Sequence, residues 1–207
     1  MLNLHVYTPT QEPVAIESLR PTQIAIGLLA VQTKAAELRK IAKKDGDRLI
    51  RKHIVPVVRG PKRRLYVIDH HHLCRAVLTA GADKVYTTVV LDLHALSRDE
   101  FWPFMDAAGL CHPFDEDGKR KTYADIPKRI ADMPDDPFRS LAGELRRRGY
   151  YAKDVAPFSE FMWADFLRRR ITRKQVEESF GAMLEHAADL AKSPEAGHLP
   201  GWCGPTA

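Results

Sequence analysis

The run from Val67 to Ala76, Val-Ile-Asp-His-His-His-Leu-Cys-Arg-Ala, most constrains how this chain can fold. It begins within Leu65–Ile68, a short β-branched and aromatic stretch typical of a strand, and apolar residues then recur at helical spacing as far as Gly81. The three histidines are therefore expected on a strand-to-helix turn. The free N–H groups and positive dipole end of a helix start favour an anion, commonly a phosphate. The pattern predicts a phosphate pocket without identifying the phosphate compound.

The composition is that of a globular chain with one core and a small appended subdomain. Of the 207 residues, 44% are hydrophobic and 29% are charged. There is no apolar stretch of about 18 residues or more, and residues 1–13 lack the apolar core of a signal peptide. The three cysteines are too few and too scattered for a disulfide framework, so Cys74 is expected to pack inward as a small hydrophobe. We expect a cytoplasmic protein with no membrane partner.

The order of apolar patterns predicts an α+β fold in two parts. Residues 1–96 follow the order strand, helix, hairpin, helix and strand of a compact mixed domain. Residues 97–192 carry almost entirely helical patterns and are expected to form a C-terminal all-helical subdomain. Residues 193–207 contain three prolines and three glycines, which predicts an irregular tail unless Trp202 docks it.

Individual elements are expected at defined places. A helix should follow Pro21, carry an apolar stripe from Ile24 to Ile41 and end at 43–46. Pro56 favours an edge position or a bulge for the second strand. The remaining predictions are strands at 14–19, 53–59, 65–69 and 84–91, helices at 98–108, 138–148, 158–170 and 174–191, N-caps at Ser97 and Thr172, and a surface loop over a pocket at 109–125.

The formal charge of +5 comes largely from four basic runs, at 62–64, 119–121, 146–148 and 168–170. Such clusters raise the question of nucleic acid or polyphosphate binding. Three of these runs also have a plain structural explanation. The first follows Gly60-Pro61 in an expected hairpin turn, and both arginine triplets close helices, where cations complement the dipole. For each run taken alone we favour a solvated face.

The stretch Ile68–Gly81 resembles the nucleotide-binding motif of the ParB/sulfiredoxin superfamily, most closely its branch of ParB-like nucleases. Free serine kinases of this superfamily have Asp-Gly-His-His-Arg at this place. Asp69, His71 and His72 match that pattern, whereas His70 replaces the glycine and Leu73 replaces the arginine. The segment from Ile16 through Arg20-Pro21-Thr22-Gln23 looks like the first box of the family. The resemblance implies a ParB/sulfiredoxin-like N-terminal domain; the helical remainder does not resemble the DNA-reading helix-turn-helix of ParB proteins.

The first functional hypothesis is a nucleotide-dependent phosphotransferase that acts on a small molecule. ATP, ADP or CTP with Mg²⁺ is the implied cofactor, and the partner is a nucleotide or another phosphorylated small molecule. Asp69 would hold the metal or the acceptor hydroxyl, and Glu17 is the only nearby carboxylate able to act as general base. The expected catalytic residues are Asp69, His71 and Glu17, and the expected nucleotide-binding residues are His70, His71, His72, Arg75, Gln23 and Pro21.

Two further hypotheses remain open. In the second, the chain is a metal-dependent nuclease or a DNA-binding protein, in which Asp69 and His71 or His72 ligate a divalent metal. The basic runs 62–64 and 119–121 would then hold a nucleic-acid backbone. In the third, the chain is a non-catalytic module that senses a nucleotide while its helical half binds another protein. The sequence does not indicate the oligomeric state.

Overall fold

The computed structural model describes residues 12–52 and 54–205, and its strands form two small sheets. The larger sheet has the order β3-β2-β5, from β3 (Leu65–Val67), β2 (Val55–Arg59) and β5 (Thr87–Asp92). Strand β2 pairs antiparallel with β3 through a hairpin and parallel with β5. The smaller sheet pairs β1 (Val14–Ala15) antiparallel with β4 (Lys84–Val85). His53, which was placed in the second strand, lies outside the described residues.

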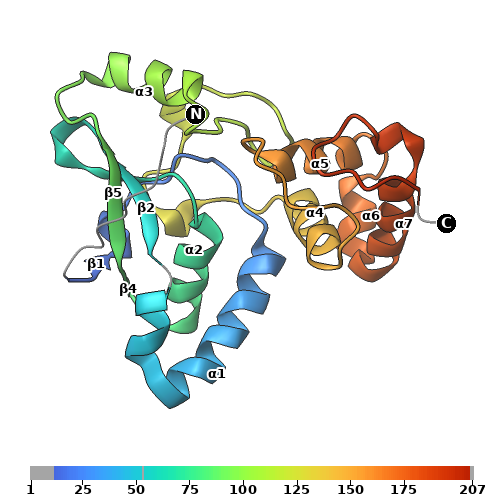
Figure 1. Cartoon of the computed structure of the whole chain (residues 1–207), viewed down its shortest axis with the longest axis horizontal. Helices are drawn as coiled ribbons and strands as arrows, with labels where there is room; N and C mark the ends of the chain where they lie inside the picture. Colours follow the sequence, from blue (N-terminus) through green and yellow to red (C-terminus); the bar gives the residue numbers. More distant parts are fainter. Residues whose placement is uncertain (1–11, 53, 206–207) are drawn as a thin grey trace.

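The helices form two groups. Near the sheet, α1 (Leu28–Lys52) packs against α2 (His71–Ala80), and α3 (Arg98–Ala107) follows the last strand. The helices α4 (Pro137–Arg147), α5 (Ser159–Arg168), α6 (Arg173–Glu178) and α7 (Phe180–Lys192) gather at the end of the molecule away from the sheet (Figure 1). The predicted α+β class with a helical C-terminal region is confirmed. In the described part of the chain, no helix is both long and apolar enough to cross a membrane.

Three apolar clusters hold these elements together. One lies between the sheets, α1 and α2, and a second packs α3 against the hairpin through Tyr66, Phe101 and Trp102. The third belongs to α4–α7 and the tail, and is centred on the stacked rings of Tyr151 and Trp163. The clusters thus place α3 with the sheet. The predicted domain boundary after residue 96 stays a prediction.

The prediction for the first helix is wrong at both ends, because α1 begins only at Leu28 and continues past 43–46 to Lys52. Residues 21–27 are buried and non-helical. Three of their backbone N–H groups donate to distant partners: Ile26 to the Pro134 carbonyl at 3.0 Å, and Thr22 and Gly27 to side chains described below. A backbone whose donors are already engaged cannot also form helical hydrogen bonds. Tertiary contacts therefore override the apolar periodicity of this segment.

Four further expectations need correction. The predicted strand at 14–19 is a strand only at Val14–Ala15, and Ile16–Ser18 form a 3-10 helix. The predicted strand at 84–91 is split into β4 and β5, and the predicted helix at 174–191 breaks at Ser179, whose φ of −151° and ψ of 73° are not helical. Pro56 lies on β2, the central strand of its sheet, so of the two predicted alternatives the edge position is wrong and the bulge is borne out. A register shift against β5 falls directly after it, between Val57 and Val58. This irregularity fits a residue that lacks an N–H for the ladder.

The helix caps are as predicted. Ser97 forms a capping box with Glu100 at the start of α3, and Thr172 forms one with Gln175 at the start of α6. The tail docks through Trp202, whose Nε1–H donates to the Ala191 carbonyl at 3.0 Å. On α5, the side chains of Phe161, Trp163 and Phe166 are buried in the core, whereas Met162 is exposed.

Gly60 at the hairpin gives a test of the packing between α3 and the sheet. A Cβ at this position would lie 2.7 Å from ring atoms of both Phe101 and Tyr66, which are buried. We expect Gly60→Ala to lower the free energy of unfolding by about 1–3 kcal/mol through overpacking, measured by urea denaturation. Gly143→Ala is the matched control, because a Cβ there meets nothing within 4 Å in α4. It should stabilise the protein by about 0.5–1 kcal/mol; equal effects of the two substitutions would contradict the packing argument.

Candidate functional site

The histidine turn lies where β3 ends and α2 begins, as the sequence predicts. His70 precedes the helix in a left-handed conformation with φ of 69°, and its side chain makes no capping hydrogen bond. The Asp69 carboxylate accepts the His70 N–H at 2.6 Å and lies 3.3 Å from His70 Nδ1. Partial desolvation acts to raise the pKa of Asp69, but the hydrogen bonds and charge of His70 outweigh it and bring the pKa to about 2. Asp69 is therefore ionised at neutral pH, and its side chain is 75% exposed.

His71 points inward, away from this exposed carboxylate. It is only 2% exposed, and its Nε2 accepts the backbone N–H of Thr22 at 3.1 Å. The ring also hydrogen-bonds the Val67 carbonyl, which accepts the Thr22 hydroxyl at 2.8 Å as well. Burial lowers the pKa of His71 to about 4. With Nε2 accepting and the other ring nitrogen facing a carbonyl, His71 is a neutral imidazole protonated on Nδ1.

His72 makes the equivalent contact one residue later. Its Nε2 accepts the backbone N–H of Gly27 at 3.2 Å. Burial, aided by the charge of Arg139, lowers the pKa of His72 to about 3. In this structure both histidines use Nε2 to hold residues 22–27, so neither Nε2 is available to a phosphate or a metal.

The other predicted site residues divide into two groups. Pro21 and Gln23 are buried in the segment that the histidines hold, and Gln23 forms a β-bridge with His112. Arg75 instead donates to the carbonyls of Ile130 and Ala131, which ties α2 to the short 3-10 helix at Ile130–Asp132. Glu17 is exposed, and its charge acts on Arg129. The structure therefore brings Pro21 and Gln23 to the turn, and engages Arg75 elsewhere.

Sequence reasoning missed a buried ion pair that the helical half brings to this turn. Arg139 of α4 is 5% exposed, its Nη1 lies 2.7 Å from Glu160 Oε2, and its guanidinium covers the Phe161 ring at 4.2 Å. Its Nε has no hydrogen-bond partner among the described residues. The charge of Arg139 lowers the pKa values of both His71 and His72. Its backbone packs against Gly27, where a Cβ would lie 3.2 Å from the Arg139 carbonyl carbon, and the Gly27 N–H donates to His72. No sequence motif distinguishes this arginine from the other arginines of the helical half.

His112, in the predicted covering loop, closes the same region. Its backbone N–H donates to the Thr22 carbonyl at 2.8 Å, and its ring lies 3.9 Å from that of Phe161 and 4.5 Å from that of Phe114. Burial lowers the pKa of His112 to about 3. The loop thus packs over the segment that the histidine turn holds.

The described residues contain no group of three or more His, Cys, Asp or Glu side chains arranged to hold a metal ion. Asp92, at the end of β5, is an exposed carboxylate bound to His94 Nδ1 and to Arg59 Nη1, each at 2.7 Å. Cys74 is fully buried, and burial raises the pKa of its thiol to about 12, as expected for an inert core cysteine.

A separate cavity of about 310 Å³ lies at the turn between α5 and α6. Arginines dominate its lining, but most are already paired. Arg168 Nη2 lies 2.6 Å from Asp136, and Arg173 Nε lies 2.8 Å from Glu177. The complete lining is Asp117, Phe138, Arg168, Arg169, Arg170, Ile171, Thr172 and Arg173.

Comparison with known proteins identifies the family. The model of a family described as "Putative ParB-like nuclease" matches residues 12–169, which include the histidine turn and the start of the helical half. The chain belongs to this ParB-like family. It is also similar to the crystal structure of protein Atu1540 from Agrobacterium tumefaciens, with 53% sequence identity and a TM-score of 0.88 over 95% of this chain and 99% of that one. No curated protein matches the chain.

The buried neutral histidines predict a pH-dependent stability. In the unfolded chain a histidine titrates near 6.5, whereas folded His71 and His72 titrate near 4 and 3. As pH falls below about 6.5, the unfolded state binds protons that the folded state does not. The free energy of unfolding should therefore fall by about 1.4 kcal/mol per pH unit for each such histidine between pH 6 and 5.

Urea denaturation at several pH values between 7 and 5 measures this slope. His71→Gln keeps an acceptor for the Thr22 N–H and should reduce the slope by about 1.4 kcal/mol per pH unit. His186→Gln, on the exposed side of α7, is the control and should leave the slope unchanged. An unaltered slope in His71→Gln would show that His71 is not held neutral.

Proposed function

We propose that the chain binds a phosphate-bearing ligand, a nucleotide, at the turn formed by Asp69–His72. The observation that carries this proposal is the start of α2, which has ten residues and no side-chain cap. The first N–H groups of such a helix lack intrahelical partners and attract anions together with the helix dipole. The match of Asp69, His71 and His72 to the superfamily's nucleotide motif supports a nucleotide over other anions.

In this proposal the histidine rings position the turn, and backbone groups bind the phosphate. His71 and His72 hold residues 22–27 through Nε2, so that α2 begins at a fixed place and orientation. Their low pKa values exclude general acid–base catalysis by these rings near neutral pH. This refines the expected catalytic role of His71 to that of a positioning residue.

Arg139 supports the proposal electrostatically. The related motif has an arginine where this chain has Leu73, and that side chain is buried. Arg139 brings a permanent positive charge to the same region from α4. Glu160 pairs with both Arg139 and Arg146, so this cluster brings two arginines and one carboxylate to the region, in addition to the ionised Asp69 of the turn itself. A positive potential beside a helix start strengthens anion binding.

Asp69 fits the role of a magnesium ligand. Mg²⁺ is usually held by one or two carboxylates together with phosphate oxygens and water. Asp69 supplies one exposed, ionised carboxylate at the rim of the turn. A bound metal would neutralise phosphate charge at this position. This proposal extends to phosphoryl transfer onto the hydroxyl group of a small acceptor, with Glu17 as the base. The alternative, nuclease activity, rests on the description of the family.

Isothermal titration calorimetry with ATP, ADP and CTP, each with and without Mg²⁺, tests the site. We expect Asp69→Asn to weaken binding of the magnesium nucleotide by about tenfold or more, because a charge-assisted metal contact is lost. Asp92→Asn is the matched control, since it removes the same charge from a carboxylate bound to Arg59 and His94. Absence of binding to every nucleotide, or equal affinities for Asp69→Asn and the unmodified chain, would refute the assignment.

His70→Gly gives a second, opposite test. A left-handed residue with a side chain costs about 1–2 kcal/mol, which glycine avoids. We expect this substitution to raise the unfolding free energy by about 1 kcal/mol and to tighten nucleotide binding, because the ligand can approach the backbone more closely. Thermal denaturation and calorimetry on the same preparation measure both quantities. Weaker binding by the glycine variant would instead indicate that the His70 ring contacts the ligand.

A further inference from the structure

The hairpin that joins β2 to β3 ends in an unusually basic and strained tip. Lys62 and Arg63 both have positive φ angles, of 58° and 56°, and the Arg64 N–H donates to the Pro61 carbonyl at 3.3 Å. The Gly60 N–H donates to the Arg64 carbonyl at 2.9 Å. Two left-handed residues closed by such a hydrogen bond make a type I′ turn.

This turn type strongly favours Asn-Gly or Asp-Gly at its two central positions. Lys62 and Arg63 occupy those positions here, and each pays a conformational cost that glycine would avoid. Strain that a sequence retains is a reason to look for a role of the residues that bear it. The strain therefore directs attention to the two cationic side chains.

The charge partners distinguish this tip from the other basic runs. In the run 119–121, each cation has a carboxylate neighbour, as in the 3.1 Å contact of Lys121 with Asp115. In the run 146–148, Glu144, Glu160 and Glu185 pair all three arginines. In the run 168–170, two of the three arginines are paired, with Asp136 and Glu195.

The cations of the hairpin tip, in contrast, have no carboxylate partners among the described residues. Lys62, Arg63 and Arg64 are all exposed, and none makes an ion pair or side-chain hydrogen bond with another residue that the structure describes. Glu100, at the start of the neighbouring α3, is engaged by the backbone N–H of Ser97. Among the four runs, only this one presents three cations without described partners.

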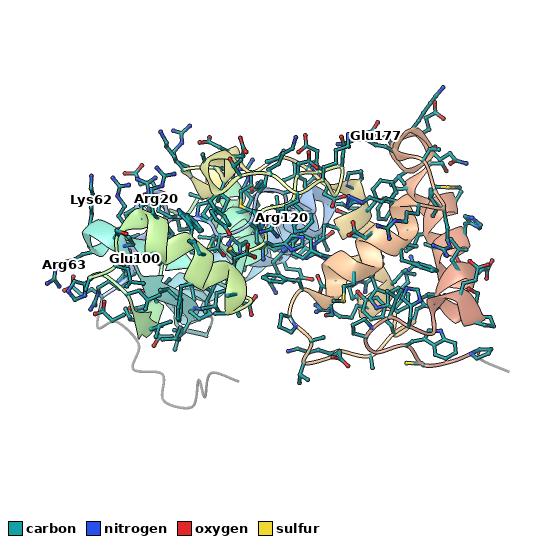
Figure 2. All side chains as sticks on the ribbon, turned by 90° about the horizontal axis from the view of Figure 1, so that it is seen from above. Arg20, Lys62, Arg63, Glu100, Arg120 and Glu177 are labelled. Atoms are coloured by element: carbon teal, nitrogen blue, oxygen red, sulfur yellow. The ribbon has the colours of Figure 1, made fainter. Side chains whose placement is uncertain are left out.

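The tip lies at one end of the molecule (Figure 2), where Gly60 packs against Phe101 of α3. β5 pairs with β2 only as far as Arg59, so residues 60–64 extend past the third strand. Figure 2 shows Lys62 and Arg63 at the end of the molecule away from the helical half, while Arg120 lies near its middle. The two runs that were expected to hold one nucleic-acid backbone are therefore separated along the long axis. The histidine turn lies at the opposite end of β3 from the tip.

We propose that this hairpin tip, Lys62-Arg63-Arg64, is a contact site for the phosphate backbone of duplex DNA. Guanidinium and ammonium groups without internal partners can pair with phosphates, and no ion pair within the protein has to be broken for this. A narrow two-stranded hairpin is also a shape that a DNA groove admits. The tip carries no large apolar side chain that would insert into a lipid surface, since its remaining residues are Gly60 and Pro61. Duplex DNA is thus favoured over an anionic membrane.

The double variant Lys62→Asn/Arg63→Gly tests this proposal through two effects of opposite sign. It installs the residues that a type I′ turn prefers, so thermal and urea midpoints should rise. It also removes two charges, so affinity for a short labelled DNA duplex, measured by fluorescence anisotropy, should fall by about tenfold or more at moderate salt. The slope of log affinity against log salt should become shallower by about 2. Arg64→Gln, at an extended residue, should weaken binding without the gain in stability.

The matched control is Lys119→Gln/Lys121→Gln, which removes the same net charge from paired lysines and should change DNA affinity far less. Nucleotide binding at the histidine turn should be unchanged in the hairpin variant, which separates this test from that of the proposed function. Unchanged DNA affinity in the hairpin variant, or an equal loss in the control, would overturn the proposal. So would binding of the unmodified chain to phosphatidylserine vesicles but not to DNA.

Discussion

The structure depends on two hydrogen bonds in which neutral histidine rings accept backbone N–H groups. His71 holds Thr22 and His72 holds Gly27, so adjacent residues of α2 fix both ends of one buried segment. A buried N–H without a partner is costly, and a ring that becomes protonated can no longer accept it. Burial keeps the two imidazoles uncharged. Each ring can therefore accept its N–H group, and neither buried N–H is left without a partner.

The held segment in turn joins the two halves of the molecule. Gly27 packs so closely against Ser140 that a Cβ would lie 2.8 Å from its hydroxyl oxygen, and Ile26 exchanges backbone hydrogen bonds with Pro134 and Asp136. Arg139 and Glu160 lie on the helical side of this contact as a buried pair. A change in the histidine turn would therefore alter the packing of α4. A ligand at the turn would lie next to the junction of the two halves.

Much of the local structure followed from local rules. The histidine turn, the end of α2 at Gly81 and the capping boxes at Ser97 and Thr172 each depend on neighbours within a few residues, so the sequence was sufficient to predict them. The start of α1 was not predictable, because partners far along the chain accept the N–H groups of Thr22, Ile26 and Gly27. The break at Ser179 and the central position of Pro56 likewise depend on packing and strand order.

The same division applies to function. By itself, the sequence determined the strand-to-helix turn, its exposed carboxylate at Asp69 and the family to which the motif belongs, because these depend on residue types at short spacing. Only the tertiary structure decided that His71 and His72 face inward, that Arg75 is engaged elsewhere and that Arg139 lies beside the turn. Only the tertiary structure also showed that the four similar basic runs differ in how many of their cations have carboxylate partners. Which groups meet across the fold is set by three-dimensional packing, and a linear pattern of residue types does not contain that information.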